Sequence, residues 1–185
     1  MTTPTLIVID IQNDYFPGGT MTLADPAAAA ANAHEALQTF RRHRWPVVIV
    51  QHLALSDEAT FFRPGTDGAA LYAGFEPQGG DTHIIKHYPN AFRDTDLSRV
   101  LTEAGTQHLV ICGMMTHMCI DTSTRAASDA GFQVTLLGDA TATRSLSFGG
   151  QSVPAEQVQT AYLAALNGSF ARVSSTRDWL QSLPV

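Results

Sequence analysis

A carboxylate, an ammonium group and a thiol stand where short aliphatic stretches of the chain end. Asp10 follows the first stretch, Lys86 closes a later one, and Cys119 comes six residues after a third stretch ends at Gly113. Only a thiolate attacks carbon well, and a carboxylate within hydrogen-bond reach can accept the thiol proton and later return it to a departing amine. These residue types therefore predict nucleophilic catalysis, with Cys119 as the nucleophile and Asp10 as the acid and base.

The surroundings expected for Cys119 would favour its thiolate. The thiol falls in the first turn of a helix predicted over residues 117–130, with Thr116 as the cap, and Lys86 can supply a cation. Both features lower a thiol pKa from its ordinary value of about 8.5. Taken singly, each residue has an ordinary structural explanation: the aspartate caps a loop, the lysine is solvated, and the cysteine packs in the core.

The elements that must position these groups alternate between strand and helix. Near-continuous apolar runs indicate strands that are buried on both faces, as in a parallel sheet covered by helices. We therefore predict an α/β fold, a three-layer α/β/α sandwich with a mainly parallel, six-stranded, Rossmann-like sheet. The predicted strands are residues 5–11, 46–52, 82–86, 108–113, 133–137 and 169–174, and the predicted helices include residues 26–44, 96–104 and 117–130.

In such a sheet, ligands bind at the carboxyl ends of the strands, so Asp10, Lys86 and Cys119 should meet there.

The 185 residues, 44% of them hydrophobic, predict a single domain over residues 1–185. Residues 53–81 lack periodicity and are rich in Gly, Pro and aromatic residues, which suggests that they shape a pocket.

Charge and composition bear on partners and location. A net charge of −6 without a basic run argues against nucleic acid or an anionic membrane as partner, and favours a small neutral or cationic substrate. The first residues have no basic segment, and the apolar run at residues 6–9 is too short for a signal peptide, so we expect a cytoplasmic protein. Cys112 and Cys119 are expected to remain separate thiols.

Three motifs together resemble the isochorismatase-like cysteine hydrolases. They are residues 6–16 (LIVIDIQNDYF), 86–92 (KHYPNAF) and 113–119 (GMMTHMC), in the family's order, within a resemblance that runs from about residue 5 to residue 143. The resemblance implies a catalytic triad of Asp10, Lys86 and Cys119 and a thioester-like covalent intermediate. It also implies an oxyanion hole made by the backbone N–H groups of Met115 and Cys119, with a cis peptide bond between Met114 and Met115.

Membership of the amidase-type branch is what a cysteine at position 119 implies, because members that cleave the vinyl ether of isochorismate generally lack it. The predicted reaction is therefore hydrolysis of a C–N bond in a small amide, lactam, carbamoyl or ureido compound. Similar nicotinamidases carry an Asp-x-His pair for a metal after the second strand, but residues 50–57 (VQHLALSD) lack it. We expect no metal and no other cofactor.

The substrate pocket is expected to be aromatic. Phe16, Phe62 and His117 are the predicted substrate-binding residues because they lie next to motif residues in the chain. Core packing explains such side chains equally well. Asn13, Asp14 and Arg93 are expected to stabilise loops.

Two other functions fit the same residues. The thiol can belong to a redox-sensing or electrophile-binding module, or the chain can be a catalytically silent scaffold of the same fold. Similar proteins commonly assemble, so we also expect a homo-oligomer, a dimer or larger, whose subunit number no sequence feature fixes.

Overall fold

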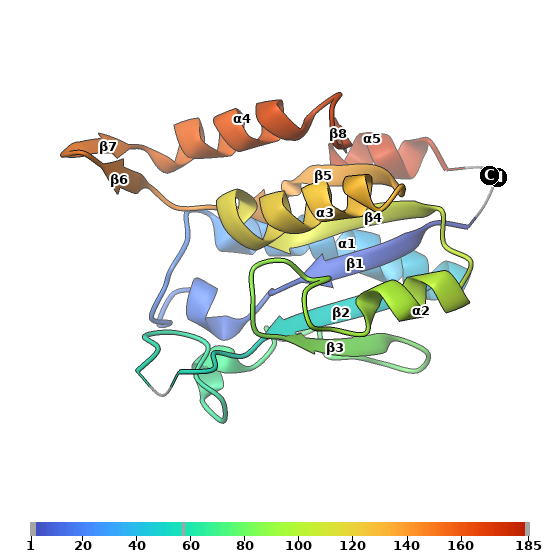
Figure 1. The fold of residues 1–185 in the computed structure, drawn as a ribbon, viewed down its shortest axis with the longest axis horizontal. Helices are drawn as coiled ribbons and strands as arrows, with labels where there is room; N and C mark the ends of the chain where they lie inside the picture. Colours follow the sequence, from blue (N-terminus) through green and yellow to red (C-terminus); the bar gives the residue numbers. More distant parts are fainter. Residues whose placement is uncertain (1–2, 57, 184–185) are drawn as a thin grey trace.

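A six-stranded parallel sheet forms the centre of the molecule (Figure 1). The computed structural model describes residues 3–56 and 58–183. The strand order is β3-β2-β1-β4-β5-β8, and the strands span Thr5–Ile9 (β1), Val47–His52 (β2), Thr82–Lys86 (β3), His108–Met114 (β4), Gln133–Ala142 (β5) and Arg172–Ser174 (β8). This order places the ends of β1, β3 and β4, which precede the predicted catalytic residues, near the middle of one sheet edge.

Helices cover both faces of the sheet, as Figure 1 shows. On one face lie α1 (Pro26–His43) and α5 (Thr176–Gln181); on the other lie α2 (Leu97–Glu103), α3 (Asp121–Asp129) and α4 (Ala155–Leu166). Alternate residues of β1 enter separate hydrophobic cores, Leu6 on the α1 side and Ile7 on the α2 side. The predicted three-layer α/β/α sandwich is confirmed.

Element boundaries differ from the prediction where the backbone turns. Strand β1 ends at Ile9 because Asp10 has a positive φ of 53°, which an extended strand does not allow. The predicted helix 117–130 divides into a π-helical turn, Thr116–Ile120, and α3. The expectation that Thr116 caps it was wrong: Met115 is the capping residue, and no side chain supplies the cap.

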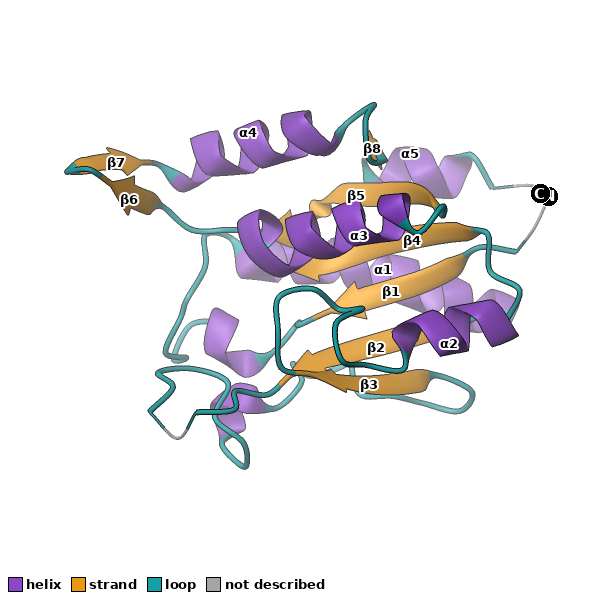
Figure 2. Cartoon of the chain, in the orientation of Figure 1, coloured by secondary structure: helices purple, strands orange, loops and turns teal. Residues whose placement is uncertain are grey.

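A short hairpin between β5 and α4 was not predicted. Strands β6 (Leu146–Phe148) and β7 (Gln151–Val153) form an antiparallel hairpin that projects beyond the sheet (Figure 2). The six largely exposed residues carry little hydrophobic pattern, and the local signal for the hairpin is the pair Gly149-Gly150, whose positive φ angles form the two-residue turn. Phe148 at its tip is 93% exposed.

The long connection between β2 and β3 is almost entirely loop (Figure 2), with one 3₁₀ turn at Asp67–Ala69. Asp14 in the turn Asn13–Tyr15 organises it: its carboxylate accepts hydrogen bonds from Phe62 N–H at 2.6 Å and from the Thr20 hydroxyl at 2.9 Å. The loop-stabilising role expected of Asp14 agrees with these contacts.

Strands β1 and β4 are in close backbone contact at Gly113. A Cβ atom at this position would lie 2.0 Å from the carbonyl oxygen of Ile9, and φ is +129°. Only glycine fits such a backbone. The contact fixes the end of β4, which leads to Cys119, against the end of β1, which leads to Asp10.

None of the helices in residues 3–56 and 58–183 combines the length and the hydropathy needed to cross a bilayer.

Candidate active site

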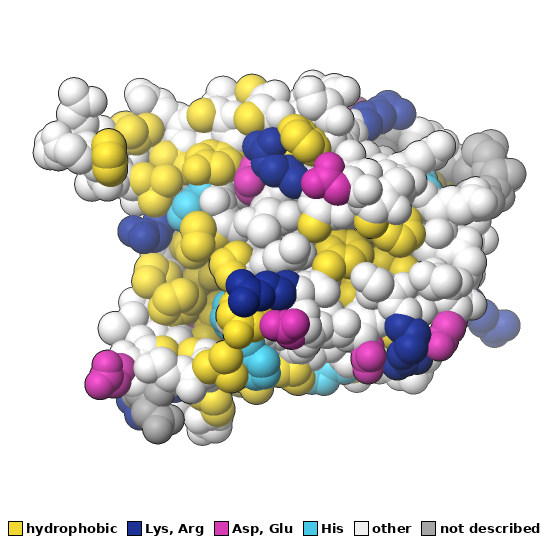
Figure 3. Space-filling view, viewed as in Figure 1, with side chains coloured by type: hydrophobic (Ala, Val, Ile, Leu, Met, Phe, Trp, Pro, Cys, Tyr) yellow, Lys and Arg dark blue, Asp and Glu magenta, His cyan; other side chains and the backbone are white. Residues whose placement is uncertain are grey.

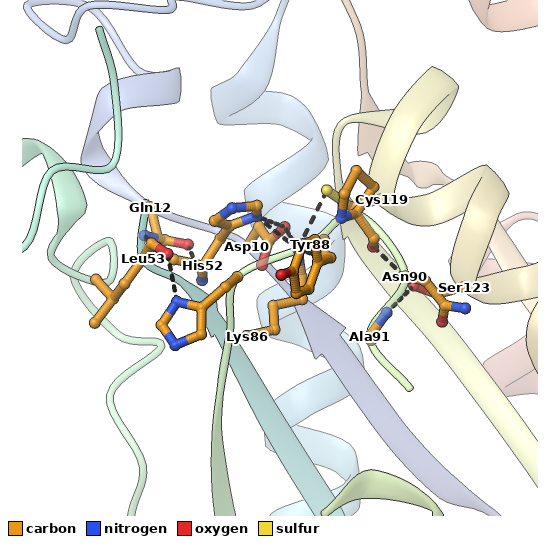
Figure 4. Close-up of polar contacts among 12 residues, drawn as sticks. Asp10, Gln12, His52, Leu53, Lys86, Tyr88, Asn90, Ala91, Cys119 and Ser123 are labelled. Atoms are coloured by element: carbon orange, nitrogen blue, oxygen red, sulfur yellow. Dashed lines mark hydrogen bonds and ion pairs between the residues drawn. The ribbon is translucent and has the colours of Figure 1, made fainter. Parts of the chain in front are cut away.

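Asp10, Lys86 and Cys119 meet at the carboxyl edge of the sheet (Figure 4). The Lys86 Nζ atom lies 2.7 Å from Asp10 Oδ2 and 3.3 Å from Cys119 Sγ. All three side chains are buried, with Cys119 4% exposed. The structure therefore brings together the three residues that the sequence singled out: Asp10 follows β1, Lys86 ends β3, and Cys119 lies in the turn after β4.

The backbone holds the Asp10 carboxyl group in an unusual place. Its positive φ turns the chain away from the strand, while its N–H donates to the carbonyl oxygen of Val50 at 3.0 Å. Such strain in a residue other than glycine persists mainly where the surrounding structure enforces it, often at functional sites. Within the described residues, Oδ1 of Asp10 has no hydrogen-bond partner, so this oxygen is open to a proton from a neighbouring thiol.

Protonation in this cluster is set by burial and by Lys86. Burial raises the pKa of Asp10, and the nearby Lys86 ammonium opposes that rise without cancelling it. For Lys86, burial lowers the pKa, but the charge of Asp10 and the hydrogen bonds to Asp10 and Cys119 raise it above its ordinary value. The 2.7 Å contact fits a carboxylate paired with an ammonium ion, and the raised pKa makes Asp10 a stronger base than an exposed aspartate.

The expectation of a lowered thiol pKa at Cys119 was wrong. Burial raises the pKa well above its ordinary value, Asp10 raises it further, and Lys86 only partly opposes them. The sequence showed the cation but not the depth of burial or the nearness of the carboxylate. Cys119 thus rests as a thiol, and attack requires a base beside it.

His52 belongs to the same cluster, although it was not among the predicted site residues. Its Nδ1 atom lies 2.8 Å from Lys86 Nζ and 3.9 Å from Asp10 Oδ2. The backbone carbonyl of Tyr88 is a further partner of Lys86, at 3.0 Å. A signal existed in retrospect, because His52 ends β2 at the same edge of the sheet.

Asp10, His52 and Cys119 carry atoms that a metal ion can bind, and these atoms lie within 4.8 Å of one another. The Lys86 ammonium already contacts one such atom of each residue. A second cation among them would face direct repulsion from Lys86. The donor set therefore suits an ammonium ion rather than a metal.

The turn after β4 carries the backbone groups predicted to bind an oxyanion. Met115 directly precedes the turn Thr116–Ile120, and Cys119 lies within it. The Met115 carbonyl accepts hydrogen bonds from the N–H groups of Met118 and Ile120. The peptide bond between Met114 and Met115 is cis. The role of the two N–H groups stays a prediction.

The three predicted substrate-binding residues lie in different surroundings. Phe62 is buried, and its ring centroid is 5.6 Å from that of His52, so it packs beside the triad. The ring of Phe16 stacks on that of Tyr72, with 3.6 Å between the ring centroids. His117 is hydrogen-bonded through Nδ1 to the Thr143 hydroxyl at 2.5 Å, which ties it to the end of β5.

A hollow of about 630 Å³ lies beside the turn Asn13–Tyr15, and its lining includes Phe16, Phe61 and Tyr72 but none of the three residues Asp10, Lys86 and Cys119. Figure 3 shows hydrophobic side chains gathered on the side of the molecule toward which the strands point. Of the three predicted substrate-binding residues, Phe62 packs beside His52, and the aromatic substrate pocket stays a prediction.

Comparisons with known proteins place these features in a family. The family model described as the isochorismatase domain matches residues 4–178, which extends the resemblance well past residue 143. The uncharacterized isochorismatase family protein YddQ of Bacillus subtilis is 46% identical over 97% of this chain and 99% of its own length.

Two further proteins bear on fold and chemistry. A protein of Oleispira antarctica with a solved crystal structure is 44% identical, with a TM-score of 0.94 over 98% of this chain and all of that one. The ureidoacrylate amidohydrolase RutB of Caulobacter segnis is 29% identical over 96% of this chain and 84% of its own length.

Proposed function

The chain belongs to the isochorismatase family of hydrolases, and we propose that it is a cysteine hydrolase that cleaves a C–N bond in a small amide, lactam, carbamoyl or ureido compound. One observation carries the proposal: a single buried ammonium group, Lys86 Nζ, contacts both the Asp10 carboxylate at 2.7 Å and the Cys119 thiol at 3.3 Å. The similarity to an amidohydrolase over nearly the whole chain supports the choice of bond.

In the proposed first half of the reaction, Asp10 accepts the Cys119 proton as the sulfur forms a bond to the carbonyl carbon. The Lys86 ammonium stabilises the negative charge on sulfur, and the N–H groups of Met115 and Cys119 bind the negative oxygen of the tetrahedral intermediate. The C–N bond then breaks, and the nitrogen leaves with the proton held by Asp10. A thioester remains on Cys119.

In the second half, water attacks the thioester carbon and gives a proton to Asp10. The C–S bond breaks, an acid leaves, and Asp10 returns the proton to Cys119, which restores the thiol. The base is needed in both halves because burial keeps the thiol protonated at rest. Phe62 and the stacked Phe16 ring are proposed to shape the apolar side of the substrate pocket, together with His117.

The alternative of a redox-sensing thiol is disfavoured by the same surroundings. Sensor cysteines react as thiolates and therefore need a low pKa and access to solvent. Cys119 has a raised pKa and is buried, and Cys112 is a free thiol inside β4.

The proposal is tested by incubating the protein with a panel of small amides, lactams and ureido compounds, followed by intact-mass spectrometry and product analysis. We expect an acyl adduct or turnover in the native protein and neither in Cys119→Ala. Cys112→Ala is the matched control, because it removes the other buried thiol and should retain both. Turnover of the same compound by Cys119→Ala at the native rate would refute the nucleophile assignment.

The homo-oligomer expected from the sequence stays a prediction. Sedimentation velocity measures it directly, and a monomer at micromolar concentration would contradict it.

A further inference from the structure

The backbone of His52 is clamped from both sides by one buried amide. Gln12 Oε1 accepts a hydrogen bond from His52 N–H at 2.8 Å, and Gln12 Nε2 donates to the His52 carbonyl at 2.9 Å. The same Nε2 donates to the Ala69 carbonyl at 2.8 Å. Gln12 is fully buried, so this clamp is shielded from water and fixes where the imidazole ring begins.

The ring of His52 faces Lys86 as a neutral acceptor. Burial, with the charges of Lys86 and His87, lowers the pKa of His52 to about 3. At neutral pH, therefore, Nδ1 accepts an N–H from Lys86 Nζ at 2.8 Å, and the ring proton is on Nε2. The Nδ1 atom of the neighbouring His87 is hydrogen-bonded to the Leu53 carbonyl at 2.7 Å, so this atom does not compete with Lys86 for His52.

Lys86 has more acceptors than protons. Its ammonium group carries three N–H bonds, and three partners receive them with hydrogen-bond geometry: His52 Nδ1, the Tyr88 carbonyl and Cys119 Sγ. Asp10 Oδ2 is nearer than any of these, at 2.7 Å, and competes as an ion pair. The contact to sulfur is the longest, at 3.3 Å, so the N–H directed at Cys119 is the one that Asp10 can draw away.

We propose that His52 is a positioning residue that holds one Lys86 N–H, so that a single remaining N–H is shared between Asp10 and Cys119. The Tyr88 carbonyl holds the other. This inference rests on the proposed function and deepens it. When the thiol proton moves to Asp10, the carboxyl group becomes neutral and the shared N–H turns fully to the new thiolate. The ammonium thus follows the negative charge while its other two bonds keep it in place.

Removing the acceptor at Nδ1 should have two opposite effects. In His52→Leu a second N–H becomes free, so Asp10 and Cys119 each receive one and the thiolate is stabilised at rest. A charge-assisted hydrogen bond of this kind corresponds to about a tenfold change or more in an equilibrium constant. Alkylation of Cys119 at pH 7 should therefore become about tenfold faster, while turnover should fall about tenfold because the ammonium group no longer favours the reacting state.

Two further substitutions separate position from polarity. The side-chain oxygen of asparagine can replace Nδ1, whereas that of glutamine reaches the place of Nε2. We expect His52→Asn to alkylate within about threefold of the native rate, and His52→Gln to behave like the leucine variant. His83→Leu is the matched control: His83 is exposed on β3 and hydrogen-bonds to the Gln51 side chain at 3.1 Å.

The experiment measures iodoacetamide alkylation of Cys119 against pH by intact-mass spectrometry, in a Cys112→Ala background so that one thiol reacts. It needs no substrate, so it is independent of the proposed hydrolysis. An alkylation profile displaced to lower pH in His52→Leu and His52→Gln, but not in His52→Asn or His83→Leu, supports the inference. Profiles that coincide in all four variants overturn it, even if Cys119→Ala lacks turnover. A loss of stability without displacement of the profile would assign His52 a purely structural role and also overturn it.

Discussion

Strand β4 and the turn that follows it each hold a buried thiol, seven residues apart, and the two thiols have different surroundings. Around Cys112 the strand packs in an apolar core, and burial alone raises the pKa of the thiol to about 12. Around Cys119 burial also raises the pKa, but Asp10 and Lys86 stand beside the sulfur. Burial makes both thiols inert at rest, and only the second has a base and a cation that can relieve this.

The sharpest way to break this contrast is to remove the base. Asp10→Asn keeps the shape of the side chain but cannot accept the thiol proton, so we expect turnover to fall by about 10³- to 10⁴-fold. Steady-state kinetics on the substrate found by the panel measures this loss. Turnover within tenfold of the native value would show that some other group takes the proton, and the two thiols would then differ less than the geometry indicates.

Removing the cation should expose the energetic difference between the regions. Lys86→Met leaves the Asp10 carboxylate buried without its ion pair, and we expect the free energy of unfolding to fall by about 3–5 kcal/mol. Urea denaturation measures it. The double variant Asp10→Leu with Lys86→Met should recover much of the loss, because no unpaired charge remains. A double variant less stable than Lys86→Met would contradict this account.

The apolar region should respond to substitution through packing alone. Cys112→Ala removes a fully buried sulfur from the core, so we expect a loss of about 1–2 kcal/mol in stability and turnover close to native. Thermal denaturation and kinetics on one preparation check both. A large loss of turnover with little loss of stability would mean that Cys112 takes part in the chemistry.

The polar region should also make stability depend on pH. The pKa of His52 is about 3 in the folded protein and 6.5 as its ordinary value. Between these values the unfolded chain binds a proton that the folded chain does not, so the free energy of unfolding decreases as the pH falls from 6.5 toward 3. His52→Asn should lessen this decrease by about 1 kcal/mol, allowing for partial exposure. Parallel denaturation curves for both proteins across this range would contradict it.

The sequence predicted the layers because aliphatic runs mark the strands. It also predicted that Asp10, Lys86 and Cys119 meet, because a parallel sheet brings the carboxyl ends of its strands to one edge; their joint catalytic role came from the family resemblance. The place of His52 depends instead on Gln12 and Lys86, which are 40 and 34 residues away, and a single histidine at the end of a strand does not by itself indicate a site residue. The thiol pKa was mispredicted because burial depends on how the whole chain packs.

The contact between Gly113 and Ile9 has a consequence for engineering this protein. Because backbone touches backbone there, the spacing between the strands that carry the base and the nucleophile does not depend on any variable side chain. A mutant library directed at the aromatic wall can therefore vary the shape of the pocket widely while the reacting groups keep their alignment. Position 113 itself should tolerate no replacement, which makes it a useful internal standard for judging the quality of such a library.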